Sequence, residues 1–368
     1  MTKYRFEDIA YNSTEKKKPV EEDKYTYIGL EHLDPQCFEV TRYGSEVAPI
    51  GEKLVMKKGD VLFGKRRAYQ KKVAIAPFDG IFSAHGMVLR PKEKVIDPKF
   101  FPMFIASDYF LNSAIKISVG SLSPTINWSA LKELEFELPD LNKQRELAEL
   151  LWAAEKTKQT YKRLIDNSHK LIQAEFIDIF KCIPTCKLCE LTSIKMGQSP
   201  DSKTYNKDEK GLPFYQGKTG FGNKYIQAPV LWCSAPTRIA EGGDVLLSVR
   251  APVGDVNIST EKCCIGRGLA AIHPIENISD TLFLFYALSA LKSEIENSGV
   301  GSTFKAITKE QVHSILIPKA NINLQHKFVE FATMQEKTLE ALNKTKSYIE
   351  ITAKSLINQN LTKEVSHV

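Results

Sequence analysis

The second half of this chain repeats the first, and this repeat constrains the fold more than any other feature. Residues 59–62 (Gly-Asp-Val-Leu) return as residues 243–246, 184 positions later, and residues 119–121 (Val-Gly-Ser) return as residues 300–302. Further matches follow in the same order: Arg66 with Arg250, Gly86 with Gly268, and Gln144 with Gln325. A period near 180 residues is far longer than a solenoid repeat. The chain therefore contains a duplicated domain.

Each half has the same internal order of expected elements. Short apolar runs broken by Gly, Pro and Asn come first, such as residues 71–76 and 243–249, and these predict β-strands with turns. A helical patch rich in Phe, Leu and Ala follows, at residues 98–117 and 279–297. A Gly-Ser loop and a short strand complete each half. The composition, 43% hydrophobic and 26% charged, excludes wholesale disorder.

Each half closes with a predicted long helix. Residues 144–180 and 325–361 contain no Gly or Pro, and apolar residues recur at alternating steps of three and four, a heptad pattern. The predicted interface residues are Leu147, Leu150, Tyr161, Leu164 and Leu171 in the first helix and Phe328, Phe331, Leu342, Ile349 and Leu356 in the second. The two helices can pair as an antiparallel coiled coil; the alternative is two amphipathic helices, each packed on its own domain.

We therefore expect an α+β fold in which two similar domains of mixed strands and helices are separated by two long paired helices, related by a pseudo-twofold repeat. The expected divisions are residues 1–140 for the first domain and 141–180 for the first helix. Residues 181–320 form the second domain, and residues 321–368 the second helix and C-terminal tail. A helix of some 35 residues spans on the order of 50 Å, enough to separate two globular domains.

Several segments resemble one known family, the specificity subunits of type I restriction–modification systems. Residues 242–254 (Gly-Gly-Asp-Val-Leu-Leu-Ser-Val-Arg-Ala-Pro-Val-Gly) resemble the central strand-turn of that family's target-recognition domain. Residues 265–269 and 299–307 resemble its later segments. In the first half, residues 27–33 and the junction at 138–145 are also similar. The resemblance covers essentially the whole chain, in the order domain, helix, domain, helix.

The resemblance implies a DNA-binding subunit with no catalytic residues and no metal or cofactor of its own. Each recognition domain would bind one half of a bipartite double-stranded DNA site, with the helices as a ruler between them. Two modification subunits, which would carry S-adenosylmethionine, would dock on the helices and methylate adenines. Restriction/translocase subunits would also join the complex. The alternatives are a stand-alone DNA methyltransferase or endonuclease, and a coiled-coil scaffold whose domains bind proteins.

Basic and polar residues that recur near the repeated motifs are the candidate DNA contacts. Phosphate contacts supply affinity and base-edge contacts supply sequence choice, so Arg66, Gln70 and Arg250 are the expected base readers. The Gly-Ser loops offer backbone N–H and hydroxyl donors to phosphate. The full predicted set is Lys65, Arg66, Arg67, Tyr69, Gln70, Lys116, Ser121, Ser123, Lys218, Thr219, Arg250, Arg267, Ser302, Thr303 and Lys305, with Lys71 and Lys72 in the same basic cluster.

Three other motifs suggest chemistry that their surroundings do not support. Cys182, Cys186 and Cys189 have the spacing of iron–sulfur ligands, yet they follow a helix at a domain junction, so we favour plain buried thiols over a cluster or a zinc site. Residues 211–219 resemble a P-loop with one residue too many between the glycines. Asp201 with Asp208–Lys210 is similar to the metal-binding acids of nucleases but lies in a polar, turn-rich stretch.

Charge and targeting signals complete the sequence prediction. Fifty Lys and Arg against 44 Asp and Glu give a net charge of +6, which permits a polyanionic partner without establishing one. No apolar run approaches the roughly 18 residues of a membrane span, and the start shows no signal-peptide pattern. Of the seven cysteines, six lie between Cys182 and Cys264, which we interpret as reduced thiols of a cytoplasmic protein.

Overall fold

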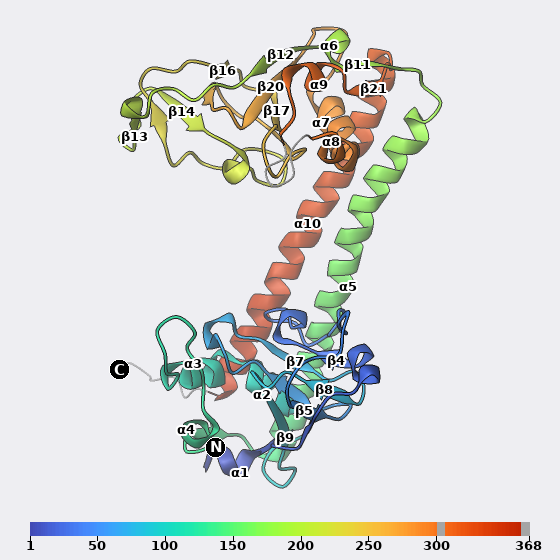
Figure 1. Ribbon diagram of the computed structural model, residues 1–368. Helices are drawn as coiled ribbons and strands as arrows, with labels where there is room; N and C mark the ends of the chain where they lie inside the picture. Colours follow the sequence, from blue (N-terminus) through green and yellow to red (C-terminus); the bar gives the residue numbers. More distant parts are fainter. Residues whose placement is uncertain (300–305, 362–368) are drawn as a thin grey trace, which may run out of the picture. The chain divides into compact units, whose positions relative to one another are not determined.

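The computed structural model describes residues 1–299 and 306–361. The chain divides into two compact units, one formed by Met1–Lys162 with Lys344–Val368 and the other by Arg163–Asn343. Both long helices cross from one unit to the other, so each unit contains one globular domain and a part of each helix (Figure 1).

The first domain is a mixture of short strands and short helices. Its elements are β1 (Thr2–Arg5), α1 (Phe6–Ile9), β2 (Ala10–Ser13), β3 (Lys16–Lys17), η1 (Glu21–Tyr25), β4 (Tyr27–Ile28), η2 (Leu30–His32), β5 (Lys53–Met56), β6 (Val61–Phe63), η3 (Ala68–Gln70), β7 (Val73–Ile75), β8 (Gly80–Phe82), β9 (Met87–Pro91), α2 (Phe100–Ala106), α3 (Asp108–Lys116), α4 (Trp128–Leu131) and β10 (Glu135–Leu138). The η elements are short 3₁₀ helices.

The second domain has the same composition. Its elements are β11 (Thr185–Lys187), α6 (Leu188–Leu191), β12 (Thr192–Met196), η4 (Ser202–Thr204), β13 (Tyr205–Asn206), β14 (Leu212–Tyr215), η5 (Lys218–Gly220), β15 (Trp232–Cys233), β16 (Ile239–Ala240), β17 (Val245–Ser248), β18 (Val256–Ile258), β19 (Cys263–Ile265), β20 (Leu269–Pro274), α7 (Thr281–Ala290), α8 (Lys292–Ser298), α9 (Lys309–His313) and β21 (Leu316–Pro318).

The two domains share one sheet topology. The order β2-β9-β6-β7 in the first corresponds to β12-β20-β17-β18 in the second, and both sheets are antiparallel. A second sheet in each domain contains one parallel pair, β4 with β8 and β14 with β19. A two-strand ribbon closes each domain, β1 with β10 and β11 with β21. The predicted α+β duplication is confirmed.

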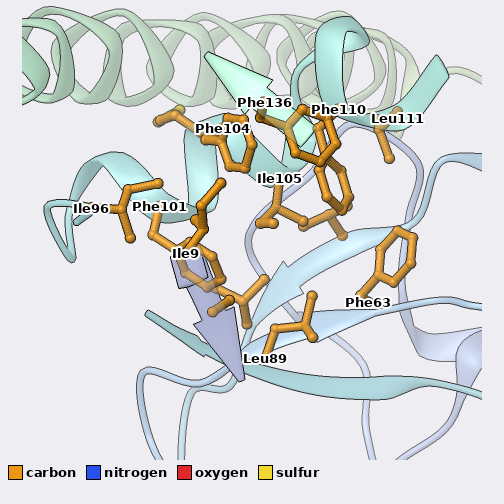
Figure 2. Close-up of a cluster of buried hydrophobic side chains, with 14 of the residues drawn as sticks. Ile9, Phe63, Leu89, Ile96, Phe101, Phe104, Ile105, Phe110, Leu111 and Phe136 are labelled. Carbon is orange, nitrogen blue, oxygen red and sulfur yellow. The ribbon is translucent and has the colours of Figure 1, made fainter. Parts of the chain in front are cut away.

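The first domain's main core lies between the antiparallel sheet and helices α2 and α3. The aromatic rings of Phe104, Phe110 and Phe136 fill its centre, with the Phe104 and Phe136 ring centroids 5.3 Å apart and nearly perpendicular (Figure 2). Edge-to-face packing of this kind is the preferred geometry for buried aromatic pairs. The apolar side chains of the predicted helical patch, residues 98–117, thus pack in the core.

The repeated Gly-Asp motif forms the same turn in both domains. Gly59 and Gly243 both have φ = +91°, a conformation that glycine adopts without strain. Each following aspartate accepts a hydrogen bond from the backbone N–H three residues earlier, at 2.8 Å for Asp60 and 2.9 Å for Asp244. Asp60 also pairs with Arg90 through two bonds, of 2.6 and 2.8 Å, whereas Asp244 contacts His273 at 2.6 Å. The motif therefore sets the start of a buried strand.

One equivalence drawn from the sequence is wrong by a residue. The partner of Asp60 is Arg90 on β9, and the partner of Asp244 is His273 on β20, so the two strands are 183 residues apart in the sequence. Gly86 therefore corresponds to Leu269 and not to Gly268. The hydrogen bonds of the preceding turn agree, since Gly86 N–H donates to the Ser83 carbonyl and Leu269 N–H to the Gly266 carbonyl, both at 3.0 Å. Glycine occurs at different positions of the same turn.

The long helices are α5 (Leu141–Phe180) and α10 (Ile322–Leu361). In the first unit, the start of α5 and the end of α10 share a core that includes Leu147 and Ile357. In the second unit, the end of α5 and the start of α10 share a core that includes Phe176 and Phe328. The two helices therefore run antiparallel, as expected. No helix in the described part of the chain combines the length and apolarity needed to cross a membrane.

The buried stripe of α5 runs one residue later than predicted. Leu150, Leu164 and Leu171 are 57%, 45% and 46% exposed, whereas Leu151 and Ile172 are buried. Apolar residues spaced three and four apart can be read in two heptad registers, one shifted by a residue from the other, when both registers contain apolar residues. Packing against the domain and α10 buries the register that begins one residue later. Of the other predicted positions, Leu147 and Phe328 are buried, and Tyr161, Phe331, Leu342, Ile349 and Leu356 are partly buried.

A fully buried glutamine joins each long helix to its own domain. The Gln144 amide N–H group donates to the carbonyls of Pro139 and Val95, at 2.8 and 3.1 Å, and its oxygen accepts from the Asp97 N–H at 2.8 Å. Gln325 makes the same three bonds, to the carbonyls of Ala320 and Ile278 and from the Asp280 N–H, at 2.8 to 2.9 Å. One side chain thus satisfies three backbone groups near the helix start.

We predict that Gln144→Met lowers the free energy of unfolding by about 2–4 kcal/mol, because it leaves three buried backbone groups without a partner. Gln325→Met should have a similar effect in the second unit. Gln159→Met, also on α5, is the matched control, because the Gln159 amide makes only one long contact, with the Glu155 carboxylate at 3.4 Å. Urea denaturation followed by circular dichroism measures the difference, and equal midpoints for Gln144→Met and the control would contradict the prediction.

Candidate nucleic-acid interface

Four of the predicted DNA contacts line one pocket of about 450 Å³ in the second domain. Lys218 and Thr219 come from η5, Arg250 from the segment after β17, and Arg267 from the turn between β19 and β20. Gln216 and Ser248 also line it. Three loops that are distant in sequence therefore bring basic and polar side chains to one concave surface.

The buried Ser248 fixes the backbone around Arg250. Its hydroxyl lies 3.1 Å from the Arg250 carbonyl and 2.6 Å from the Pro252 carbonyl, and its own carbonyl accepts the Gly254 N–H at 2.9 Å. Arg250 also forms an isolated antiparallel bridge with Ala306. The guanidinium is exposed while its backbone is held on both sides, so the side chain is presented from a rigid base.

Two glycines allow Gln216 to approach the β19–β20 turn. A Cβ atom on Gly266 would lie 2.8 Å from the Gln216 Cα, and one on Gly268 would lie 2.6 Å from the Gln216 carbonyl oxygen. Both distances are shorter than real Cβ contacts, so neither position accepts a side chain without movement. The Gly-Arg-Gly sequence thus places Arg267 beside Gln216. Gln216 was not among the residues predicted from the sequence, and the glycines on either side of Arg267 are the signal that indicates it.

Lys218 is not a free cation in this pocket. The Asp255 carboxylate accepts hydrogen bonds from Lys218 Nζ, at 2.6 Å, and from Lys292 Nζ. Burial alone would raise the pKa of Asp255, but the two lysine partners outweigh it and hold that pKa below its usual value. Arg250 and Arg267 have no ion pair among the described residues. The two arginines therefore carry the unpaired positive charge here.

The first domain presents its basic cluster on the segment that follows β6. Arg66 and Arg67 are exposed, Tyr69 is 56% exposed, and Gln70 is half-buried. Arg67 has φ = +54°, a left-handed conformation at the start of η3. Lys65 is half-buried, and burial, with a smaller effect of Lys16, lowers the pKa of its amine. The side chains available to a ligand are thus mainly those of residues 66–70.

Lys71 and Lys72 are used within the domain. Lys71 Nζ donates to the Asp108 carboxylate at 2.6 Å and to the Asn112 side chain at 3.1 Å, both on α3. Lys72 Nζ donates to the Leu30 carbonyl at 2.6 Å. Both lysines therefore stabilise the position of the segment that carries Arg66 and Arg67, and neither amine is unpartnered.

The first Gly-Ser loop lies beside this segment. Val119 and Thr125 exchange backbone hydrogen bonds at 3.0 and 2.9 Å, and Thr125 forms an isolated bridge with Arg66. Ser121 is exposed at the loop tip and Ser123 is half-buried, and Lys116 is exposed in the last turn of α3. The predicted contacts Ser302, Thr303 and Lys305 of the second loop lie outside the described residues.

His85 is a further basic side chain beside the candidate contacts of the first domain. It belongs to the turn between β8 and β9, and its ring Nε2 lies 3.5 Å from Arg66 Nη1. The corresponding turn of the second domain carries Arg267, one position earlier. In both domains, the turn before the last sheet strand thus places a basic side chain near the arginine that follows the central strand: His85 near Arg66, and Arg267 near Arg250.

The three motifs that suggested other chemistry form ordinary structural elements or exposed surface. Cys186 is buried, but Cys182 is exposed and Cys189 half-buried, so the expectation of three buried thiols is wrong. Within residues 1–299 and 306–361, no group of three or more His, Cys, Asp or Glu side chains could hold a metal ion. Residues 212–215 of the P-loop-like segment form strand β14. Asp201 caps η4, and Asp208 is exposed.

A duplicated α+β domain with an exposed arginine at the same place in each copy is typical of proteins that have two similar recognition surfaces. The family described as "Type I restriction modification DNA specificity domain" matches residues 3–167 and 184–353. The chain belongs to this family and, with its two such domains, is a specificity subunit of a type I restriction–modification system.

Relatives and solved structures agree with this membership. The MjaX type I restriction enzyme specificity subunit of Methanocaldococcus jannaschii is 31% identical over 97% of this chain and 91% of that protein. A chain solved in work on complex assembly and conformational transition of the type I R-M system is 26% identical, covers 99% of this chain and 98% of its own, and has a TM-score of 0.66. The type I S subunit from M. genitalium, at 17% identity, shares the fold with a TM-score of 0.56, over 99% and 96% of the chains.

We predict that Asp255→Asn lowers the free energy of unfolding by about 1 kcal/mol near neutral pH, because Lys218 and Lys292 lose their shared counter-ion and both are partly screened by solvent. The lowered pKa means that the carboxylate contributes above pH ~4, and that its contribution is lost as the pH falls further. Thermal unfolding from pH 3 to 8 measures this. Glu241→Gln, which removes the exposed Lys262 pair, is the control and should change little; an equal effect of both variants would contradict the prediction.

Proposed function

We propose that this specificity subunit reads a bipartite DNA sequence, one half-site with each domain, and that it is not itself catalytic. Methylation would come from two modification subunits that carry S-adenosylmethionine, and cleavage from restriction/translocase subunits. The lack of methyl-donor and nucleotide-binding motifs in the sequence supports this division of labour. The chain would act in the cytoplasm, with residues 1–140 and 181–320 as its two readers.

The observation that carries the proposal is the equivalent placement of Arg66 and Arg250. Each follows the central strand of its domain and forms an isolated bridge to the segment after a Gly-Ser loop, Arg66 with Thr125 and Arg250 with Ala306. An exposed guanidinium on a rigid base can donate two parallel hydrogen bonds to the O6 and N7 atoms of guanine in the major groove. Two such positions in one chain fit two half-sites.

The surroundings of the two arginines differ, which supports recognition of two different sequences. Arg66 has Arg67, Tyr69 and Gln70 beside it on one continuous segment. Arg250 instead shares a pocket with Lys218 and Arg267 from separate loops. Sequence choice depends on which donors and acceptors meet the base edges, so unequal side chains on equal backbones produce an asymmetric target.

The exposed leucines of α5 support a surface for the modification subunits. Leu150, Leu164 and Leu171 share one heptad frame and are each about half exposed or more. A row of large apolar side chains on a helix is typical of a protein interface. These three leucines are therefore the contacts that we propose for the modification subunits, and they lie outside the buried stripe of α5.

The test is to map methyladenine across the genome of the source cells with the gene present and deleted. We expect a split motif with an unspecified central gap to lose methylation when the gene is absent. An unchanged map, combined with no binding of the purified chain to a pool of random-sequence duplexes, would overturn the proposal. Methyl transfer by the isolated chain would instead support the stand-alone methyltransferase.

Base and phosphate contacts can be separated by substitution. We predict that Arg66→Ala weakens discrimination in the first half-site by about 1–3 kcal/mol and leaves the second unchanged, and that Arg250→Ala does the reverse. Lys116→Ala should weaken binding to all sequences alike and reduce its salt dependence. Selection from a randomised duplex pool measures both effects. A uniform loss for Arg66→Ala, or altered sequence choice for Lys116→Ala, would contradict the assignment.

A further inference from the structure

The turn between the last two sheet strands carries a different basic residue in each domain. In the first domain, residues 83–86 (Ser-Ala-His-Gly) join β8 to β9, and His85 is the basic side chain among them. In the second, residues 266–269 (Gly-Arg-Gly-Leu) occupy the corresponding positions, and Arg267 is the basic side chain. Both turns are held by the same bond from their fourth residue to their first, at 3.0 Å.

His85 is exposed and lies beside the arginine that we propose as a base reader. The Arg66 N–H donates to the His85 carbonyl at 3.3 Å, and Arg66 Nη1 approaches the ring Nε2 at 3.5 Å. A guanidinium has only donors, so a hydrogen bond between these two groups requires the neutral ring with Nε2 as the acceptor. The backbone contact keeps the two residues adjacent whatever the protonation state of the imidazole.

The charged groups that act on His85 are cations. Arg66 and Lys65 lie on the segment after β6, and Lys53 lies at the start of β5. On β4, Tyr27 hydrogen-bonds Ser83 in the same turn, and burial raises the pKa of that phenol, so it stays neutral. Burial first, and then these three positive charges, lower the pKa of His85 below its usual value. In the free chain the imidazole is therefore neutral at physiological pH.

We propose that His85 is a proton-linked DNA contact of the first domain, in which the protonated imidazole donates, beside Arg66, to an acceptor atom of the first half-site. The inference rests on the proposed function. A DNA phosphate oxygen or a guanine edge supplies the negative charge that the site lacks, and either one favours the imidazolium over the neutral ring. Protonation also replaces the Nε2 acceptor with a second donor.

The second domain has no such link at the corresponding place. Arg267 is exposed in its turn and lines the same pocket as Arg250. A guanidinium is charged at every physiological pH, so its contact with DNA releases or takes up no proton. The two half-sites should therefore respond differently to pH although the two domains share one fold.

The sign of the effect follows from linkage. DNA raises the proton affinity of His85 relative to the free chain, so binding takes up a proton. Affinity is highest below the free-chain pKa and falls as the pH rises through the bound-chain pKa, by at most about tenfold per pH unit for one proton. Because the free-chain pKa lies below its usual value of about 6.5, the fall should begin below pH 6.5 and end above the bound-chain pKa.

The experiment titrates the full chain with fluorescein-labelled duplexes by fluorescence anisotropy, from pH 5.5 to 8 at constant ionic strength. The duplexes carry the bipartite site recovered by selection, either intact or with one half-site scrambled. We expect affinity for the intact and first-half duplexes to fall with pH. Affinity for the second-half duplex should stay within about twofold of a constant value where the acceptor is a base edge, and should fall as well where the acceptor is a phosphate. His85→Arg should make affinity independent of pH at the high value that the wild-type chain shows at low pH. His85→Gln should make it independent of pH at the low value that the wild-type chain shows at high pH.

Two further variants serve as controls. Arg267→His should introduce a slope on the second-half duplex, and His169→Arg, an exposed position on α5, should leave the wild-type slope intact. A slope that survives His85→Arg overturns the inference while the proposed function stands. Failure of the wild-type chain to bind any duplex at any pH overturns both. A slope seen equally on unrelated duplexes assigns the acceptor to phosphate, and a slope seen only on the selected site assigns it to a base edge.

Discussion

The buried glutamine at the start of each long helix is the contact on which the rest of each unit depends. Gln144 joins three points of the chain: Pro139, two residues before α5, and Val95 and Asp97, both ahead of α2. Gln325 does the same for α10 and α7. An amide has both donors and an acceptor, so it satisfies carbonyls and an N–H together, which neither a carboxylate nor an amine can do. The angle at which each helix leaves its domain is thereby fixed.

Apart from this shared glutamine contact, the two domains differ at positions where the backbone conformation accepts more than one side chain. The Gly-Asp turn is identical in φ and in its capping bond, because a left-handed glycine and a short acceptor are both needed there. The aspartate's other partner differs, Arg90 in one domain and His273 in the other. Within one element, the backbone conformation is the same in both domains while the neighbouring side chains differ. One fold can therefore present two different surfaces.

The sequence was informative where a pattern reflects backbone constraint and less so where it reflects packing choice. The duplication, the strand that follows Gly59 and the two long helices were all predictable, since glycine positions and the absence of helix breakers act locally. The frame of the α5 stripe was not, because Leu150 and Leu151 are equally apolar and only the tertiary neighbours select between them. The same limit hid Gln216, whose position depends on glycines 50 residues away.

Several of the cations that the sequence groups together are used within their own domain, which a count of basic residues does not reveal. Lys71, Lys72 and Lys218 all belong to predicted basic clusters, yet each amine donates to an acceptor of its own domain. A lysine presents a flexible point charge that finds the nearest carboxylate or carbonyl, whereas Arg66 and Arg250 are held by their backbones with the guanidinium outward. The lysines thus stabilise the segments that the arginines extend from. On the proposed function, sequence choice then depends on few rigid donors, and the salt dependence of binding should be shallower than the number of basic residues implies.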